Sequence, residues 1–255
     1  MTKLRSLTPV LLLALAPAAA LADDYRFEIK GTYDRDMPDV DFFDDVDHVS
    51  LGGTWYFKPV STEGVPLPEA AFLGRSSYLS VIAARFDGFF DTRLNAQGAN
   101  LGVYIPETMF FVSGGASRGQ AVTFVNSTIV QKEYFTNWFG QLGITPLDGL
   151  LVTTRFEEGG YTPNINARYV GKLPNSHFYA GSVNLVDPDG GDISYRLDFD
   201  YYFDDSASLG VGYSHNGDVV ELRAEKFFSK TWAAGVSGYT SDGQKGFGLN
   251  VSWRH

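Results

Sequence analysis

The chain has 255 residues, a formal net charge of -10, 28 glycines and an aromatic content of 15%. It contains no cysteine, which excludes a disulfide framework and any thiol chemistry. Its acidic balance argues against nucleic acid as a partner. The combination of many glycines with many aromatic residues favours a protein of curved strands over a helical one.

The beginning of the chain has the pattern of a secretory signal peptide. Two basic residues and a short apolar run are followed by Ala20-Leu21-Ala22, which matches a small-x-small cleavage site. About a dozen apolar residues are too few to span a bilayer, for which roughly 20 are needed. We therefore predict a signal peptide over residues 1–22 and a mature domain over residues 23–255.

After residue 22 the chain alternates between apolar and polar side chains. Alternation with a period of two is typical of strands that have one apolar and one polar face. We count about fourteen such segments, and twelve is an alternative count. They lie near residues 25–33, 49–57, 76–87, 101–105, 110–114, 130–142, 150–156, 165–169, 179–185, 193–203, 209–213, 220–224, 232–238 and 247–253. The facing of residues 76–87 stays open, because both of its faces carry apolar residues.

The links between these segments fall into two groups. Tight links with Pro or paired Asp and Ser lie near residues 106–108, 143–148, 173–176, 204–207 and 229–230. The alternate links lie near residues 34–46, 88–97, 118–129, 158–162, 187–191, 215–218 and 241–244, and several of them are longer. This asymmetry is typical of a transmembrane antiparallel up-and-down β-barrel in an outer membrane. One link, residues 59–75, is long although it falls among the tight ones.

Aromatic residues gather near the ends of the segments, where a membrane barrel places them at headgroup level. These residues are Tyr25, Tyr33, Trp55, Phe57, Tyr195, Tyr201, Phe203, Tyr213, Phe227, Trp232 and Trp253. A soluble β-sandwich, the alternative all-β fold, does not account for this placement. We therefore predict a membrane barrel.

One short block resembles a known family. Residues 66–75, PLPEAAFLGR, resemble a P-x-x-E-A-A-F-L-x-R block that precedes the third strand in the general porin family of Gram-negative bacteria. The resemblance implies a single-chain outer-membrane barrel through which solutes diffuse, and it brings no catalytic residues. The chain departs from such barrels at its end, because Trp253 is followed by Arg254 and His255 instead of ending on an aromatic residue.

The polar faces of the predicted strands carry charges of both signs. Such charges would line a water-filled lumen and set its selectivity. The predicted pore-lining residues are Arg26, Glu28, Lys30, Arg155, Arg168, Arg196, Asp198, Asp200, Glu221, Arg223 and Glu225. A structural interpretation is equally open, in which opposite charges pair across the intervening strand near residues 209–213. The inward residues there, Ser208, Gly210, Gly212 and Ser214, are small.

The link at residues 34–46 is strongly acidic. Its Asp39, Asp41, Asp44 and Asp45 form a candidate site for a divalent cation, since carboxylates suit Ca²⁺ or Mg²⁺. The simpler interpretation is a solvated acidic loop, because charge runs are usually solvated. We assign no metal and no cofactor.

No enzyme signature is present. The four histidines lack metal-ligand spacing, and the glycines form neither a G-x-S-x-G motif nor a P-loop. Ser214 and His215 are adjacent, so a strand points them to opposite faces and prevents a nucleophile–base contact. We predict no catalytic residues.

The pattern as a whole predicts a porin in the outer membrane of a Gram-negative bacterium, which lets small hydrophilic solutes and ions diffuse passively. The alternative is a structural or adhesive barrel with a closed, ion-paired interior and an acidic surface loop. The expected partners are outer-membrane lipid and lipopolysaccharide, the barrel-assembly machinery and small hydrophilic solutes. A homo-oligomer is compatible with the sequence.

Overall fold

The computed structural model describes residues 24–39, 45–88, 92–125, 128–158, 164–187 and 192–255. The signal peptide predicted over residues 1–22 lies outside these ranges and stays a prediction. Among the described residues, no helix is both long and apolar enough to cross a membrane.

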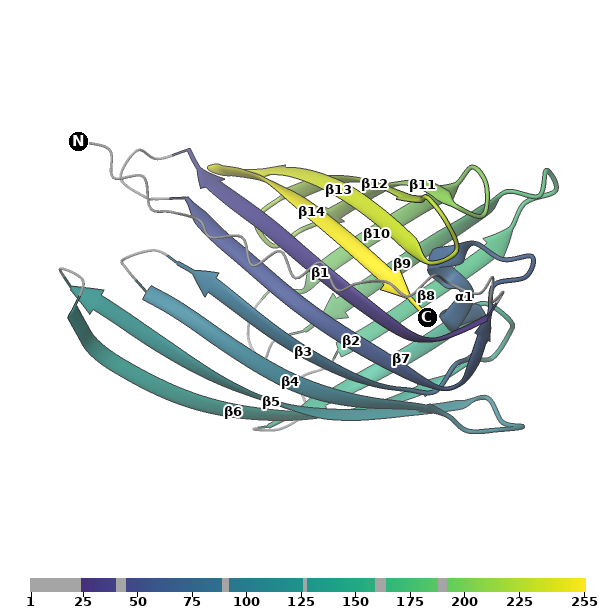
Figure 1. Cartoon of the computed structure of the whole chain (residues 1–255), viewed down its shortest axis with the longest axis horizontal. Helices are drawn as coiled ribbons and strands as arrows, with labels where there is room; N and C mark the ends of the chain where they lie inside the picture. The colour runs from purple at the N-terminus through teal and green to yellow at the C-terminus, as the bar shows by residue number, and fades with distance from the viewer. Residues whose placement is uncertain (1–23, 40–44, 89–91, 126–127, 159–163, 188–191) are drawn as a thin grey trace.

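Fourteen strands and two short helical turns make up the described part of the chain (Figure 1). The strands are β1 (Asp24–Pro38), β2 (Val46–Ser61), β3 (Tyr78–Asp87), β4 (Thr92–Tyr104), β5 (Phe110–Val125), β6 (Thr128–Ile144), β7 (Leu150–Glu157), β8 (Asn164–Lys172), β9 (Phe178–Val186), β10 (Ser194–Tyr202), β11 (Ala207–Ser214), β12 (Val219–Phe227), β13 (Trp232–Ser241) and β14 (Gln244–Arg254). The 3-10 helix η1 (Leu67–Glu69) and the helix α1 (Ala70–Leu73) lie between β2 and β3.

The strands form a closed antiparallel barrel. Each strand pairs with its neighbours in sequence, and β1 also pairs with β14. Closure leaves no free sheet edge, which is what a lipid environment requires of a sheet. The predicted up-and-down barrel is confirmed with fourteen strands, so the alternative count of twelve is wrong.

The predicted difference in link length between the two ends of the barrel is only partly present. The turns after β4, β6, β8, β10 and β12 are tight, and they lie at the end where β1 begins and β14 ends. At this same end, residues 62–77 between β2 and β3 form a longer connection that carries η1 and α1. At the opposite end the strands of some hairpins extend further, above all those of β5–β6 (Figure 1). Several links there are nevertheless as short as the tight turns, such as residues 126–127 between β5 and β6.

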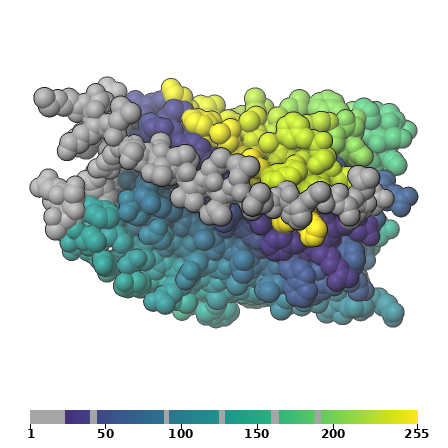
Figure 2. Space-filling view, in the orientation of Figure 1, coloured from purple at the N-terminus to yellow at the C-terminus, as the bar shows by residue number. Residues whose placement is uncertain are grey.

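Apolar side chains point outward. Leu51, Val81 and Leu222 are exposed over 60%, 54% and 64% of their surface, although each lies in the middle of a strand. In a soluble protein such residues would be covered, so this wall is built to contact lipid. Figure 2 shows closely packed side chains on the coloured parts of the visible face.

The open facing of residues 76–87 is now settled. Leu79 and Val81 are exposed on the outside, whereas Ser80 bonds to the backbone of Asn100, and the Asn100 amide donates to Tyr78. The even-numbered positions of β3 therefore point inward. The sequence left this open because Ile82 is apolar yet lies on the inward side.

Three predicted links are shorter than expected. The acidic link predicted at residues 34–46 begins only after Pro38, and the link predicted at residues 88–97 ends before Thr92, where β4 begins. The link predicted at residues 118–129 belongs mostly to β5 and β6. Beyond the lipid-contacting zone both faces of a strand meet water. The alternation of apolar and polar residues therefore disappears from the sequence there, although the strands remain paired by backbone hydrogen bonds.

Two of the predicted headgroup-level aromatics are buried instead. Tyr25 is 5% exposed and Phe227 is 3% exposed. A β-bulge explains Tyr25, because the amides of both Arg26 and Phe27 donate to the His255 carbonyl at 2.8 Å and the register shifts there. Phe227 lies on the inward side of β12 and packs against Leu67. For these two residues the prediction is wrong.

The outward assignment of β10 can be tested at Leu197. Replacement by Arg should lower the free energy of unfolding by roughly 2–4 kcal/mol, because a cation on the lipid face near the bilayer midplane is poorly solvated. Urea unfolding in lipid vesicles measures the change, and Leu197→Met is the apolar control. Equal stability of both variants would contradict the assignment.

Candidate pore lining and constriction

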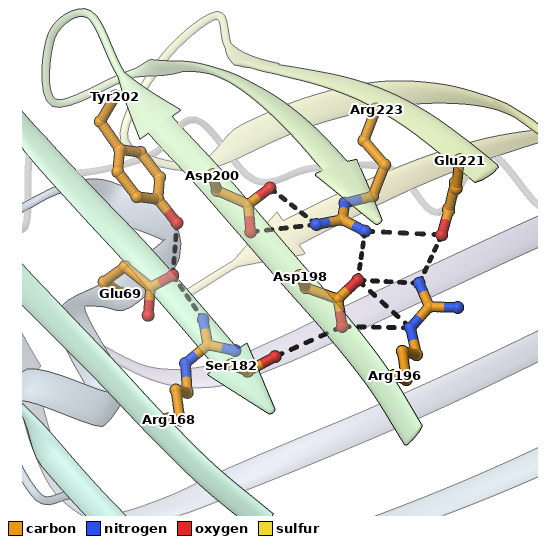
Figure 3. A network of polar contacts seen from close by, with 9 residues as sticks. All are labelled: Glu69, Arg168, Ser182, Arg196, Asp198, Asp200, Tyr202, Glu221 and Arg223. Carbon is orange, nitrogen blue, oxygen red and sulfur yellow. Dashed lines mark hydrogen bonds and ion pairs between the residues drawn. The ribbon is translucent and has the colours of Figure 1, made fainter. Parts of the chain in front are cut away.

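A network of five charged side chains lines the inward face of β10 and β12 (Figure 3). Arg223 Nη1 lies 2.7 Å from Asp198 Oδ1, and its Nη2 lies 3.1 Å from Asp200 Oδ1. Arg196 Nη2 lies 2.9 Å from Asp198 and 2.5 Å from Glu221. These contacts join all five predicted residues into one cluster, which we call the β10–β12 network.

The network spans β11, which lies between its two strands, because β11 presents glycine there. A Cβ atom on Gly210 would lie 1.9 Å from Asp200 Oδ1, and one on Gly212 would lie 2.8 Å from Asp198 Oδ1. At either position an added Cβ atom would displace the carboxylate, so glycine at both positions makes room for the side chains to meet. The pairing that the sequence allowed across small residues is therefore present.

The network is not electrically neutral. It contains three carboxylates and two guanidinium groups, so one negative charge is in excess. The side chains of Arg196 and Asp200 are 41% and 24% exposed to the lumen. A polar cavity of about 230 Å³ lies beside the network and is also lined by Arg168 and Ser182. This wall can hold water and small polar solutes.

Residues 62–77, hereafter the inward segment, fold into the barrel at the end with tight turns. Glu69 is the centre of its attachment and is only 1% exposed. Arg168 on β8 donates to Glu69 Oε1 at 2.5 Å, and the Tyr202 hydroxyl on β10 donates to the same oxygen (Figure 3). A buried carboxylate is tolerated only when it is paired in this way.

A second attachment comes from Arg254 at the end of β14, which is 6% exposed. Its Nε lies 2.5 Å from Glu28 on β1, and its Nη1 donates to the Leu67 carbonyl at 2.7 Å. The guanidinium also lies over the rings of Tyr25 and Phe227, at 4.7 and 4.5 Å. Arg254 therefore links the first strand, the last strand and the inward segment.

The turn between β10 and β11 supplies a further contact. The Leu67 amide donates to the Asp205 carbonyl at 2.7 Å. Beside it, the hydroxyl and amide of Ser206 donate to Asp204 and hold the pKa of that carboxyl below its usual range. These hydrogen bonds order the turn, to which the inward segment is attached through Leu67.

These contacts place the inward segment across the lumen. Ala70 packs with Tyr25, Tyr56 and Val60 on β1 and β2, whereas Glu69 reaches β8 and β10 on the other side. The segment therefore narrows the barrel at this end. Sequence reasoning assigned no role to residues 59–75 and missed Glu69 and Arg254. The available signals were the porin-like block around Glu69 and the unusual basic residue after Trp253.

The remaining predicted pore-lining residues are spread along the wall. Arg155 on β7 lies over the Phe139 ring at 4.0 Å and pairs with Glu157 at 2.7 Å. Lys30 lies two residues after the inward Glu28 on β1, and Glu225 lies two residues after the inward Arg223 on β12. Because side chains of a strand alternate between its faces, both point into the lumen. Arg26 is exposed beside the bulge, so alternation from Glu28 does not fix its facing.

The candidate cation loop is only partly within the described residues. Asp41 and Asp44 lie outside them. Asp45 pairs with Arg35 at 2.7 Å, and Asp39 lies 3.6 Å from Lys245 Nζ. Within the described ranges, no group of three or more acidic or His side chains could hold a metal ion. Divalent-cation binding by this loop stays a prediction.

The neighbours Ser214 and His215 point to opposite faces, as predicted. Ser214 pairs in register with Arg196 on the inward face, and the His215 ring stacks on Tyr195 at 4.9 Å. They cannot act together as nucleophile and base.

Solved structures of outer-membrane barrels resemble this chain. The outer membrane protein Omp33 of Acinetobacter baumannii matches with a TM-score of 0.71 at 18% identity, over 91% of this chain and 99% of that one. The toluene transporter TodX of Pseudomonas putida matches with a TM-score of 0.52 at 8% identity, over 91% and 88% of the two chains. The likeness shows the fold. No family profile and no curated protein matches the chain.

Gly210 offers a direct test of the β10–β12 network. The variant Gly210→Ala should displace Asp200 from Arg223 and lower the free energy of unfolding by about 2 kcal/mol, the scale of a hydrogen bond between charged groups. Urea unfolding in lipid vesicles measures this. Gly238→Ala is the control, because the nearest atom to its added Cβ is 3.9 Å away. If both variants lose equal stability, the glycine is not needed for the network.

Glu69 tests the inward segment. Glu69→Gln should leave Arg168 without its anion and lower the free energy of unfolding by about 3 kcal/mol, the scale of a broken buried pair. The loosened segment should also be cleaved faster by a protease added at the tight-turn end. Glu63→Gln, an exposed change in the same segment, should be cleaved like the wild type. Equal cleavage of both variants would show that Glu69 does not hold the segment.

Proposed function

We propose that this protein is an outer-membrane porin through which small hydrophilic solutes diffuse passively. The observation that carries the proposal is that the closed barrel is apolar outside and charged inside, the reverse of a soluble protein. Exposed apolar side chains cover the outside, and the ion-paired β10–β12 network lies inside next to a polar cavity. An apolar exterior fits lipid and a charged interior requires water.

The orientation follows from the two ends of the barrel. Tight turns are typical of the periplasmic side and longer hairpins of the cell surface. The inward segment and the ends of β1 and β14 would then face the periplasm. This placement, with a cleaved signal peptide, is that of a single-chain barrel of the Gram-negative outer membrane.

The lumen favours small solutes and cations. The inward segment crosses the lumen at the periplasmic end, and the long side chains of the β10–β12 network occupy part of the middle. The network carries one excess negative charge, and charges that line a narrow aqueous pore bias which ions pass. We therefore propose a modest preference for cations.

A similar fold does not imply that the same solute is transported. TodX is a toluene transporter, whereas the wall between β8 and β12 of this chain carries Arg and Asp around its cavity and Glu221 beside them. Such side chains retain water, so an aromatic hydrocarbon would gain little there. The chemistry of this lumen supports hydrophilic solutes.

A second candidate function is a structural or adhesive barrel with a closed interior. The ion pairs of the β10–β12 network and the inward segment favour it, because both fill space within the barrel. The two candidates differ in one measurable property, which is whether ions cross the barrel.

Single-channel recording in planar bilayers tests the proposal. The wild type should show a stable conductance step, and a salt gradient should give a reversal potential that favours potassium over chloride. Asp200→Asn should lower this preference about two- to fivefold, because a unit charge about 8 Å from the ion path contributes about 0.5 kcal/mol in water.

The matched control is Glu107→Gln, an exposed change in the tight turn after β4. Its ion preference should equal that of the wild type. A wild type without conductance steps at any voltage would contradict the porin and support the closed barrel. Equal preferences for Asp200→Asn and Glu107→Gln would contradict the role of the network in selectivity.

A further inference from the structure

The outward face of β3–β6 changes character toward the end with long hairpins. Val81 on β3 is apolar and 54% exposed, and the next outward positions along the strand are Ala83 and Arg85. The neighbouring strands change in the same way. The outward basic side chains of this wall are Arg85, Arg93, Arg118 and Lys132. They lie directly beyond the apolar zone that would contact acyl chains.

The strand register places these residues in adjacent rows. One row runs through Ala83, Gln97, Arg118 and Thr136 on β3, β4, β5 and β6. The next row runs through Arg85, Asn95, Gln120 and Tyr134. Amide side chains therefore lie between the arginines of neighbouring rows, and the Gln120 amide donates to the Tyr134 hydroxyl at 3.0 Å.

Two grooves on the outer wall meet at this patch. The groove nearer the bilayer interior, the lower groove, has a volume of about 680 Å³, and its lining includes Leu51, Val81 and Ala116. The upper groove has a volume of about 560 Å³, and its lining includes Arg85 and Gln120. Gln97 and Arg118 line both of them. The combined groove is apolar toward the bilayer interior and polar toward the cell surface, which matches an amphiphilic molecule.

The charge of this wall is opposite to that of the chain, which has a formal net charge of -10. Asp87 is shared by Arg85 and Arg93, at 2.8 and 2.7 Å. Arg118 lies over the Tyr134 ring at 5.8 Å, and its side chain is exposed. Positive charge is therefore in excess on β3–β6.

The wall formed by β1, β2 and β14 differs at the same end of the barrel. Its outward Arg35 lies 2.7 Å from Asp45, and its outward Lys245 lies 3.6 Å from Asp39. Asp47 adds a further carboxylate, 3.9 Å from Arg35. That wall therefore offers no excess positive charge, and it provides a matched comparison.

We propose that the groove over β2–β6 binds a phosphorylated glycolipid of the outer leaflet, with its phosphates at Arg118 and Arg85 and an acyl chain along Leu51 on β2 and Val81 on β3. The two arginines lie on strands two apart and are offset by two residues along the strand, which places their Cα atoms about 12 Å apart. This spacing suits a disaccharide headgroup with a phosphate at each end. The amides of Gln97 and Asn95 can bond to its hydroxyl groups.

The inference rests on the outer-membrane placement proposed above, and it does not depend on conduction. Arg85 and Arg118 point away from the lumen, so their loss should not alter the passage of ions. Failure of lipid binding and failure of the porin proposal can therefore be distinguished.

Native mass spectrometry of the full protein in detergent, titrated with bisphosphorylated lipid A, tests the proposal. The double variant R85Q/R118Q should bind at least about tenfold more weakly, because each basic residue near a membrane surface contributes roughly a factor of five. R85K/R118K should retain most of the binding. The control R35Q/K245Q on the other wall should bind like the wild type.

Dephosphorylated lipid A and phosphatidylglycerol complete the experiment. We expect the wild type to bind both at least about tenfold more weakly than bisphosphorylated lipid A. Equal lipid A binding by R85Q/R118Q and R35Q/K245Q would overturn the site. Equal binding of phosphatidylglycerol and lipid A by the wild type would overturn the assignment to a glycolipid. Conductance of R85Q/R118Q in neutral bilayers should equal that of the wild type.

Discussion

The need to pair every backbone amide and carbonyl inside a bilayer governs this structure. Water is absent there, so a sheet can cross only if its first and last strands join. The β1–β14 ladder makes that closure, with eleven residue pairs from Glu28–Arg254 to Pro38–Gln244. Once the barrel is closed, one face of each strand meets lipid and the other encloses a lumen. The outward leucines and the inward charges are both consequences of this arrangement.

The inside of the barrel then presents the opposite problem. Charged side chains need either water or partners, and the chain provides both. The β10–β12 network is partly exposed to the lumen, whereas Glu69 and Arg254 are nearly fully buried and make several bonds each. The partly exposed network can interact with ions, and the buried pairs fix the inward segment. The same chemistry thus fixes the architecture in one place and, in the function that we propose, sets ion selectivity in another.

Much of the barrel was predictable from alternation alone, and the hairpin at residues 193–213 shows why. Leu197 and Phe199 face lipid while Asp198 and Asp200 face the lumen, so the pattern is strict and the strands follow it. Alternation fails where both faces meet water, as in the extension of β1 to Pro38. It also fails at a bulge, which turned Tyr25 inward.

The attachment of the inward segment was beyond local sequence patterns. Glu69 and Arg168 are 99 residues apart, and Arg254 and Glu28 are 226 apart. Their proximity depends on closure of the whole barrel. Local periodicity carries no information about such contacts, which is why the role of residues 59–75 stayed unassigned. By contrast, the small residues of β11 correctly indicated that β10 and β12 could pair across it.

The central claim is that the inward segment narrows a water-filled lumen, and its most direct test is the size limit for solute entry. Liposome swelling with sugars of increasing size would compare the wild type with a variant in which a short Gly-Asn turn replaces residues 62–77. The account predicts slow entry of all but the smallest sugars in the wild type and a clearly larger size limit in the variant. An unchanged size limit in the folded variant would contradict it.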